Sequence, residues 1–358
     1  MVSTRGKLRL AGKIVGVLLL AAVLAVAALL LYLSLHEYRP EAVEPAWTAG
    51  EAQALPAAGE ELTLLTWNVG FAGLGEESDF FMDCGHMTRP TEAVASKNLQ
   101  GILDTLDGTV ADVVLLQEVD VDSKRSYYVD QRAALSDAFA GTAAFAPNYV
   151  CDYVPYPIPD TIGRVESGIL TLSRFRMEEP QRVSLPVPFS WPVRMANLKR
   201  CLLTARLPLS GTDAELVLVN LHLEAYDDGT GKRMQTEQLV QLLQEEYEAG
   251  NYVIAGGDFN QSFAGVGENY PLLDPDYWHP STLERDILPS DWTIAFDDAL
   301  PTCRLLNQPY DPDDPATQYY VIDGFLCSPN VTVQSVSTLD KGFRFTDHNP
   351  VLLTFTLA

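Results

Sequence analysis

Short apolar runs that lie beside chemically active polar side chains recur along this chain, and they constrain its fold more than any other feature. A run of apolar, β-prone residues is typical of a strand buried on both faces. Because an open α/β sheet gathers its functional groups where strands end, the pattern predicts an α/β enzyme with one shared site. The four segments are Thr66-Trp67-Asn68, Leu116-Gln117-Glu118, Gly257-Asp258-Phe259-Asn260 and Thr346-Asp347-His348-Asn349-Pro350.

The N-terminal region predicts a single membrane span. Residues 1–13 contain four basic residues and no acidic one, and residues 14–35 carry no charge at all. A helix of about 20 apolar residues crosses a bilayer. The basic flank places the N-terminus in the cytoplasm and the remainder outside the cell membrane. A cleaved signal peptide is the alternative, but its apolar core is shorter, about 7–15 residues.

The charge of the chain disfavours long nucleic acids as substrates. Four of the 24 Lys and Arg lie in the first 13 residues, which leaves 20 against 48 Asp and Glu, a formal charge of −28. Polyanion binding draws much of its affinity from Lys and Arg. A local basic patch is compatible with this total, so a nuclease is disfavoured without being excluded.

Residues 36–60 are rich in Pro, Ala and Glu and predict an extended linker that lifts the domain off the membrane. Residues 61–358 then form the catalytic domain. The five cysteines show no CxxC and no metal-finger spacing. Their odd number leaves at least one thiol unpaired in the monomer, and the pairing of the others is left open. Strands are expected at 62–68, 112–118, 168–173, 202–207, 215–223, 252–257, 319–327, 331–339 and 350–357, helices at 92–106, 131–139 and 233–247, and a long loop at 270–291.

Glu118 and Asp347 are the predicted carboxylate ligands of a metal ion. Mg²⁺ takes oxygen ligands and usually only one or two protein carboxylates. Asn68 is the third predicted ligand, since it can orient a metal-bound water or a phosphate oxygen. The alternatives are a solvated carboxylate at Glu118 and a turn residue at Asn68.

Asp258 and Asn260 are predicted to act directly in catalysis. A carboxylate can align or deprotonate water, while a neighbouring carboxamide donates to a phosphate oxygen. In an extended chain these two side chains point the same way. The alternative is an Asx turn, in which they bond the local backbone.

Two histidines complete the predicted site. His348 can exchange a proton near neutrality, and Asp323, within an apolar strand, is its expected orienting carboxylate. The alternative is that Asp323 caps a turn before Gly324. Alternation places Asn220, His222 and Glu224 on one strand face, which favours a site edge over a satisfied core histidine.

These motifs, with Gly168–Arg174, Asn220–Leu223 and Ile322-Asp323, resemble those of the endonuclease/exonuclease/phosphatase superfamily in their order along residues 60–358. The resemblance implies a DNase I-like, four-layer α/β sandwich of two packed mixed β-sheets flanked by helices, here preceded by one transmembrane helix. It also implies Mg²⁺-dependent hydrolysis of a phosphoester, with Mn²⁺ or Ca²⁺ as alternatives.

The resemblance also implies roles for individual residues. Glu118 is the principal metal ligand, with Asn68 and Asp347 beside it. Asp258 positions or activates water, and Asn260 donates to the transition state. Asp323 and His348 form the Asp–His pair of the family, and His222 contacts the phosphate.

The substrate is left open by these motifs. We expect a small phosphoester or a phospholipid head group, with a surface nuclease as the runner-up and an inactive binding module of the same fold as the alternative from another class. No obligate protein partner is indicated. Six cations are candidates for a head-group contact, with an ordinary surface cation as the alternative for each: Arg89, Lys124, Arg125, Arg164, Lys199 and Arg200.

Overall fold

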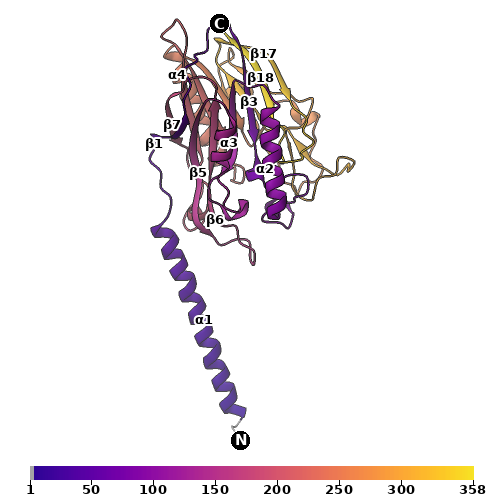
Figure 1. The fold of residues 1–358 in the computed structure, drawn as a ribbon. Helices are drawn as coiled ribbons and strands as arrows, with labels where there is room; N and C mark the ends of the chain where they lie inside the picture. The colour runs from indigo at the N-terminus through magenta and orange to yellow at the C-terminus, as the bar shows by residue number, and fades with distance from the viewer. Residues whose placement is uncertain (1–3) are drawn as a thin grey trace.

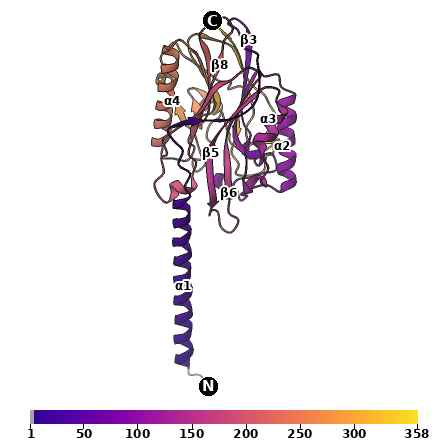
Figure 2. The ribbon, with the colours of Figure 1, turned by 60° about the vertical axis from the view of Figure 1, so that its left-hand side comes forward.

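Two seven-stranded sheets packed face to face form the core of the protein, in a computed structural model that describes residues 4–358. Figure 2 shows the four layers, with one helix outside one sheet and two helices outside the other. The predicted DNase I-like sandwich is therefore confirmed. The helices are α1 (Thr4–Leu35), α2 (Glu92–Asp107), α3 (Gln131–Ala138) and α4 (Thr230–Glu248).

The first sheet has the strand order β17-β18-β3-β4-β6-β5-β2 and the second has β1-β7-β8-β9-β10-β16-β13. The first comprises β17 (Val331–Thr338), β18 (Val351–Leu357), β3 (Glu61–Asn68), β4 (Val113–Asp120), β6 (Gly163–Ser173), β5 (Thr142–Val154) and β2 (Trp47–Gly50). The second comprises β1 (Val43–Pro45), β7 (Glu178–Ser184), β8 (Cys201–Pro208), β9 (Glu215–His222), β10 (Tyr252–Asp258), β16 (Asp323–Cys327) and β13 (Thr293–Ala295). Two small pairs, β11 (Gln261–Phe263) with β12 (Ser281–Leu283) and β14 (Cys303–Arg304) with β15 (Tyr319–Tyr320), lie outside them.

Each sheet contains one parallel pair joined by a crossover helix. Strands β3 and β4 are parallel and linked by α2, and β9 and β10 are parallel and linked by α4. All other pairings within the two sheets are antiparallel, so both sheets are mixed. The two βαβ units bring the carboxyl ends of four strands to one end of the sandwich.

The core between the sheets is apolar apart from one polar bridge. Leu64 and Leu115 of the first sheet pack with Leu218 and Ile254 of the second. Nearer the site, the Asn220 side chain accepts from Gln117 Nε2 at 2.9 Å and donates to the carbonyl oxygens of Leu116 and Leu170 at 3.2 and 3.0 Å. These bonds cross between the sheets, because Gln117 lies on β4 and Asn220 on β9. Asn220, which the sequence placed at a site edge, fixes the relative position of the two sheets.

Gly257 is required by the backbone of a neighbouring strand. Its φ is +153°, and a Cβ there would lie 2.0 Å from the carbonyl oxygen of Leu221 on β9. Any larger residue would therefore push β9 and β10 apart just before the catalytic end of the strands. The close approach at Gly257 is thus to the backbone of β9.

The segment 36–60 is not a free linker over its central part, so that prediction is wrong there. Residues 43–45 form β1, which pairs with β7, and residues 47–50 form β2, which pairs with β5. The segment thereby adds one edge strand to each sheet. Its Pro and Ala content concealed this, because edge strands tolerate residues that central strands do not.

The predicted span 14–35 lies within α1, which continues back to Thr4 through most of the predicted basic segment; residues 1–3 of that segment lie outside the described part of the chain. Figure 1 shows α1 projecting away from the domain. The five cysteines are free, four of them buried and Cys84 exposed. The expected loop at 270–291 contains the short strand β12.

Candidate active site

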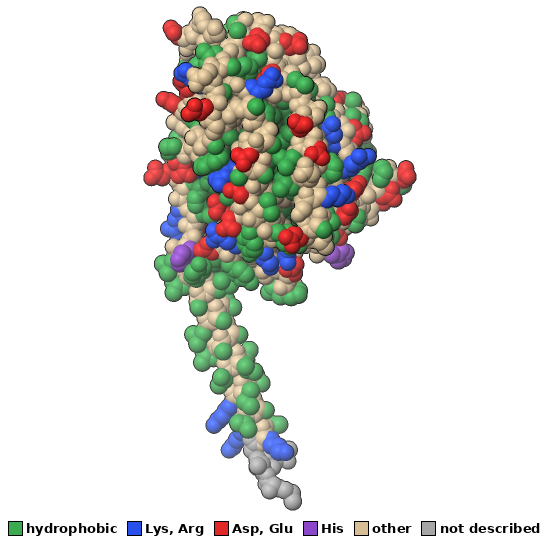
Figure 3. Space-filling view, viewed as in Figure 1, with side chains coloured by type: hydrophobic (Ala, Val, Ile, Leu, Met, Phe, Trp, Pro, Cys, Tyr) green, Lys and Arg blue, Asp and Glu red, His purple; other side chains and the backbone are tan. Residues whose placement is uncertain are grey.

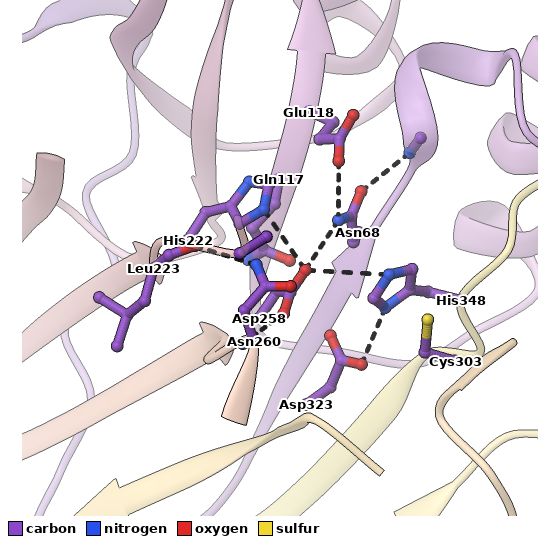
Figure 4. Close-up of polar contacts among 12 residues, drawn as sticks. Asn68, Gln117, Glu118, His222, Leu223, Asp258, Asn260, Cys303, Asp323 and His348 are labelled. Carbon is purple, nitrogen blue, oxygen red and sulfur yellow. Dashed lines mark hydrogen bonds and ion pairs between the residues drawn. The ribbon is translucent and has the colours of Figure 1, made fainter. Parts of the chain in front are cut away.

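Four strand ends from the two βαβ units bring their polar residues together. Asn68 ends β3, Glu118 lies near the end of β4, His222 ends β9 and Asp258 ends β10. The Asn68 Nδ2 group donates to Glu118 Oε1 at 3.2 Å and to Asp258 Oδ2 at 3.0 Å. Figure 4 shows these contacts, which join the two sheets at their shared carboxyl end.

Glu118 reaches the site through an irregularity in β4. The pairing of β4 with β6 shifts register between Leu116 and Val119, and Glu118 has a φ of +56°. A non-glycine residue pays for this left-handed conformation, and such strain clusters at functional sites. The irregularity directs the half-buried Glu118 carboxylate into the pocket, and the sequence pattern gave no sign of it.

Asp258 is held by contacts on both of its oxygens. Oδ1 accepts from the backbone N–H of Asn260 at 2.8 Å, which is the Asx turn considered as an alternative. Oδ2 accepts from Asn68 and lies 3.4 Å from His222 Nε2. The turn and the site role are therefore compatible, since the turn fixes the carboxylate that faces the cavity.

The ring of His348 faces Asp258, and Asp323 orients it. The Asp323 Oδ2 atom is 2.9 Å from His348 Nδ1, so Nε2 faces Asp258 Oδ2 at 3.8 Å and Asp347 Oδ2 at 4.0 Å. Behind the ring, Trp67 Nε1 donates to the His348 carbonyl oxygen at 2.9 Å. The ring of His348 is thus oriented by Asp323 of the second sheet, and its backbone is tied to Trp67 of the first.

The surroundings shift the pKa values of the two histidines in opposite directions. Burial would lower the pKa of His348, but the carboxylate of Asp323, with Cys303 and Asp347 nearby, raises it well above the ordinary value. Burial lowers the pKa of His222, which favours the neutral imidazole. Burial and then Asp323 raise the pKa of Asp258 to about 6. The site therefore combines a cationic and a neutral imidazole around one carboxylate of raised basicity.

The donor set fits a divalent metal ion at Glu118 and Asp347. Burial and then the nearby Glu118 carboxylate raise the pKa of Asp347 to about 6, so a cation between the two carboxylates would relieve their repulsion. Among residues 4–358, Asn68 is the one side chain that donates to the Glu118 carboxylate, and Thr346 is the one that donates to the Asp347 carboxylate. Lone pairs therefore remain on both carboxylates, and oxygen donors are what Mg²⁺ prefers.

Two tight groups of metal-type side chains also occur around His348, one with Cys303 and Asp347 and one with Asp258 and Asp323. They fit a metal less well than the Glu118 pair. Burial raises the pKa of the Cys303 thiol to about 12, and His348 Nδ1 is already bonded to Asp323. Asn68 donates from Nδ2 to Glu118 and Asp258 while its Oδ1 accepts from Gly70 N–H at 3.0 Å, so in this arrangement it links a predicted metal ligand to the predicted catalytic carboxylate.

Asn260 lines the same pocket but is not extended. Its φ is +49°, and its Nδ2 donates to the Leu223 carbonyl oxygen at 2.9 Å. The side chain therefore ties the end of β10 to the end of β9, and the expected extended-chain alignment with Asp258 does not occur. Its second amide hydrogen remains for a ligand.

The pocket extends from these polar groups into an apolar half that motif analysis missed. Its empty volume, counted to the open mouth, is about 1130 Å³. Tyr226 donates to Asp83 at 3.2 Å, and both residues line the pocket. Residues 71–91, which lie in the chain between Asn68 and Glu118, supply much of the apolar wall. The apolar lining comprises Phe71, Leu74, Phe80, Met82, Ile162, Leu198, Trp278, Leu305 and Leu306.

Of the six predicted head-group cations, only Arg125 and Arg200 line the pocket. Arg125 pairs with Asp120 at 2.9 Å, and Arg200 lies 3.7 Å from Glu224. The other four form ion pairs elsewhere: Arg89 and Lys124 with Asp160, Arg164 with Asp122 and Asp152, and Lys199 with Glu37.

The fold and this arrangement of strand-end carboxylates and imidazoles define the class of the protein as a DNase I-like α/β sandwich. Residues 65–348 match the model of the endonuclease/exonuclease/phosphatase family, and the chain belongs to that family. Members of this family are generally hydrolases.

Solved structures support the fold. An endonuclease/exonuclease/phosphatase from Beutenbergia cavernae superposes with a TM-score of 0.58 at 17% identity, covering 83% of this chain and 72% of its own. A family protein from Bacteroides thetaiotaomicron has a TM-score of 0.51 at 16% identity, covering 84% and 98%. One from Bacteroides vulgatus has a TM-score of 0.50 at 15% identity, covering 84% and 100%. No curated protein matches the chain significantly.

Proposed function

We propose that this protein is a divalent-metal-dependent phosphoester hydrolase, a phosphodiesterase or phosphomonoesterase. The observation that carries the proposal is the placement of Asp258 Oδ2. It lies 3.0 Å from Asn68 Nδ2, 3.4 Å from His222 Nε2 and 3.8 Å from His348 Nε2, at the floor of an open pocket. A carboxylate so surrounded is oriented for proton transfer next to groups that stabilise a phosphoryl transition state.

In the proposed reaction, water attacks phosphorus and the bond from phosphorus to the leaving oxygen breaks. Asp258 accepts the proton of the attacking water, which its pKa of about 6 favours over an ordinary aspartate. His348, held as imidazolium by Asp323, gives its Nε2 proton to the leaving oxygen. The products are an alcohol and a phosphate or phosphate monoester, and proton exchange between the two groups and solvent restores the site.

The remaining residues bind and orient. His222 is neutral, and its Nε2–H holds Asp258 and faces the pocket where a phosphoryl oxygen would lie. Asn260 has one amide hydrogen free for a second phosphoryl oxygen. A cation held by Glu118 and Asp347 would supply positive charge beside the phosphoryl group and acidify bound water. Mg²⁺ is the proposed ion, with Mn²⁺ and Ca²⁺ as alternatives.

The pocket and the charge of the chain favour a small phosphoester or a lipid head group over a nucleic acid. Its walls are largely apolar beyond the polar floor. Of the three arginines that line it, Arg125 and Arg200 face carboxylates, and Arg304 donates to backbone carbonyl oxygens. A nucleic-acid channel needs a basic track along which the backbone binds. The formal net charge of −24 for the whole chain opposes such a track.

We further propose that α1 anchors the protein in the cell membrane, with its N-terminus cytoplasmic and the catalytic domain outside. The stretch Lys7–Leu35 is long and apolar enough to cross a bilayer. A cleaved signal sequence can meet the same criterion of length and hydropathy. The last turns of α1, however, pack against the domain, and this packing favours a helix that is retained as an anchor.

The test is a substrate panel on the full-length protein in detergent. Bis(p-nitrophenyl) phosphate, phospholipid in mixed micelles and plasmid DNA are each incubated with Mg²⁺ or with EDTA. We expect hydrolysis of the first two with Mg²⁺ and none with EDTA. Rapid DNA nicking at physiological salt would instead favour the nuclease, and no turnover of any substrate would favour the binding module.

A further inference from the structure

The active site and the membrane helix lie at the same end of the domain. Strand β18 is antiparallel to β3, so the carboxyl end of β3, with Asn68, lies opposite the C-terminus. Figures 1 and 2 show the C-terminus at one end of the domain and α1 leaving from the other. The pocket that begins at Asn68 therefore opens at the end from which α1 departs.

The last turns of α1 pack into the wall of that pocket. Leu29, Leu30 and Leu33 lie on one helix face, and Leu33, which is 5% exposed, packs in an apolar cluster with Tyr149 and Ile162. Both of the latter residues line the pocket, as does Leu198 of the same cluster. The last turns of the membrane helix and the wall of the substrate cavity thus belong to one apolar cluster.

Polar contacts also hold the C-terminal end of α1 against the domain. The buried Glu37 carboxylate accepts from Arg194 at 2.8 Å and from Arg39 at 3.0 Å, and lies 3.6 Å from Lys199 Nζ. Tyr32 OH donates to Asp152 at 2.9 Å. Because apolar and charged contacts both hold the helix, the domain cannot swing freely on a linker.

The length of the helix sets the level of the membrane surface. About 20 residues span the hydrocarbon core, so a span that begins after Lys13 reaches the outer boundary at about Leu33. Leu33 is the residue that packs against the domain, and Trp191 Nε1 donates to Ser34 Oγ at 3.1 Å. The base of the domain therefore lies at the boundary itself, where Trp and Tyr are enriched.

This base exposes large apolar side chains around the helix. Ile158 is 82% exposed and Tyr156 is 62% exposed in the loop between β5 and β6, and Trp191 is 55% exposed, with Val193 beside it in sequence. Figure 3 shows apolar side chains gathered where α1 leaves the domain. In water such a group of side chains is costly, whereas the bilayer interface accommodates it. The patch also reaches the site, since Tyr156 packs on Phe81, which belongs to the cluster of Leu33.

We propose that this face, made by Tyr153, Tyr156, Ile158, Trp191 and Val193, rests in the interface of the bilayer that α1 spans. The pocket then opens at head-group level, and its apolar half receives the glycerol or acyl portion of a phosphoester that stays in the same membrane. The proposal concerns the docking of the face and the route of the substrate, and the second part rests on the proposed hydrolase function.

Docking of the face is tested by fluorescence in nanodiscs of phosphatidylcholine and phosphatidylglycerol. The full-length protein carries Cys84→Ser, which removes the exposed thiol, and either Ile158→Cys or Val110→Cys, labelled with the environment-sensitive dye NBD. Val110 is the matched control, because it is 77% exposed before the amino end of β4, away from the site. We expect blue-shifted emission and quenching by brominated lipid at 158 only. Equal behaviour at the two positions would overturn the docking.

The route of the substrate is tested with Ile158→Asp and Tyr156→Asp combined, against Val110→Asp. We expect the first variant to lower hydrolysis of vesicle phospholipid roughly tenfold, through the apparent KM, because two apolar contacts with the interface are lost. Hydrolysis of soluble bis(p-nitrophenyl) phosphate should not change in either variant. Equal losses on both substrates, or no turnover of phospholipid by a protein that hydrolyses the soluble ester, would overturn the lipid route. Failure on both substrates would refute the hydrolase function, and the fluorescence result would still decide the docking.

Discussion

Two clusters of buried carboxylates lie near the end of β4 and differ in how their charges are balanced. Asp120 is fully buried and accepts from Arg125 through two bonds, at 2.9 and 3.1 Å. The guanidinium of Arg125 also stacks on Phe71, 3.8 Å from the ring centre. Near Glu118, by contrast, Asp258, Asp323 and Asp347 share His348 as their nearest cation.

The comparison distinguishes a carboxylate that stabilises the fold from carboxylates that can take part in the reaction. Asp120 has a dedicated cation that binds it through two hydrogen bonds and balances its charge, and such a buried pair is costly to break. The cluster around His348 keeps excess negative charge, and its pKa values are raised for Asp258 and Asp347. Incomplete balance therefore marks the place where a metal ion and a phosphate can bind.

The largest expected effect is on turnover at the unbalanced cluster. Asp258→Asn should reduce hydrolysis of bis(p-nitrophenyl) phosphate by roughly 10²–10⁴-fold, because the amide cannot accept the proton of water. Its melting temperature should not fall, since one buried negative charge is removed. Asp213→Asn, in an exposed turn, is the matched control. Activity within a few fold of wild type in Asp258→Asn would contradict the assignment.

At the balanced cluster the expected effect is on stability. Arg125→Met should lower the free energy of unfolding by about 3–5 kcal/mol, because it leaves the Asp120 charge buried without a partner. Urea denaturation measures this loss. The double variant Arg125→Met with Asp120→Leu should recover most of the lost free energy of unfolding, because it no longer contains the unpaired charge. Arg174→Met, which breaks an exposed pair with Asp112, should cost less than about 1 kcal/mol. An Arg125→Met loss no larger than that of Arg174→Met would remove the distinction between the clusters.

A divalent cation should stabilise the unbalanced cluster by mass action. At 100 times its dissociation constant, Mg²⁺ should add about 2.7 kcal/mol to the free energy of unfolding, because it binds only the folded site. The rise in melting temperature on titration with MgCl₂ reports this. Glu118→Gln should abolish the rise, whereas Glu51→Gln, at an exposed position, should preserve it. Persistence of the full rise in Glu118→Gln would place the metal elsewhere.

The smallest expected effect is the pH dependence of kcat/KM. Asp258 must be deprotonated to act as base, so the rate should fall about tenfold per pH unit below its pKa of about 6. His348 must be protonated to act as acid, and its pKa lies above the ordinary imidazole value, so a second fall is expected on the alkaline side. His348→Gln should lose the alkaline fall and keep the acidic one. An alkaline fall retained in that variant would assign it to another group.

Most elements of the fold were predictable from local pattern. The expected helix at 92–106 is α2, and the expected strand at 62–68 is β3, because both have the periodicity of their class and clear ends. The edge strands β1 and β2 were not predictable, since they form in a Pro- and Ala-rich segment through pairing with β7 and β5. Likewise, Asn220 lies on the expected strand, but its role between the sheets depends on Gln117, which is 103 positions away.

The sequence by itself determined which residues stand near the ends of buried strands, and among them the pair of Asp323 with His348, because apolar runs and the polar residues that interrupt them are local features. Only the tertiary structure decided that Glu118 is turned inward by a shift in register, and that Asp120 is balanced while Asp258 is not. It alone brought the end of α1 against the wall of the pocket. These outcomes depend on contacts between residues far apart in the chain, such as Trp67 with His348 across 281 positions, and no local pattern encodes such distances.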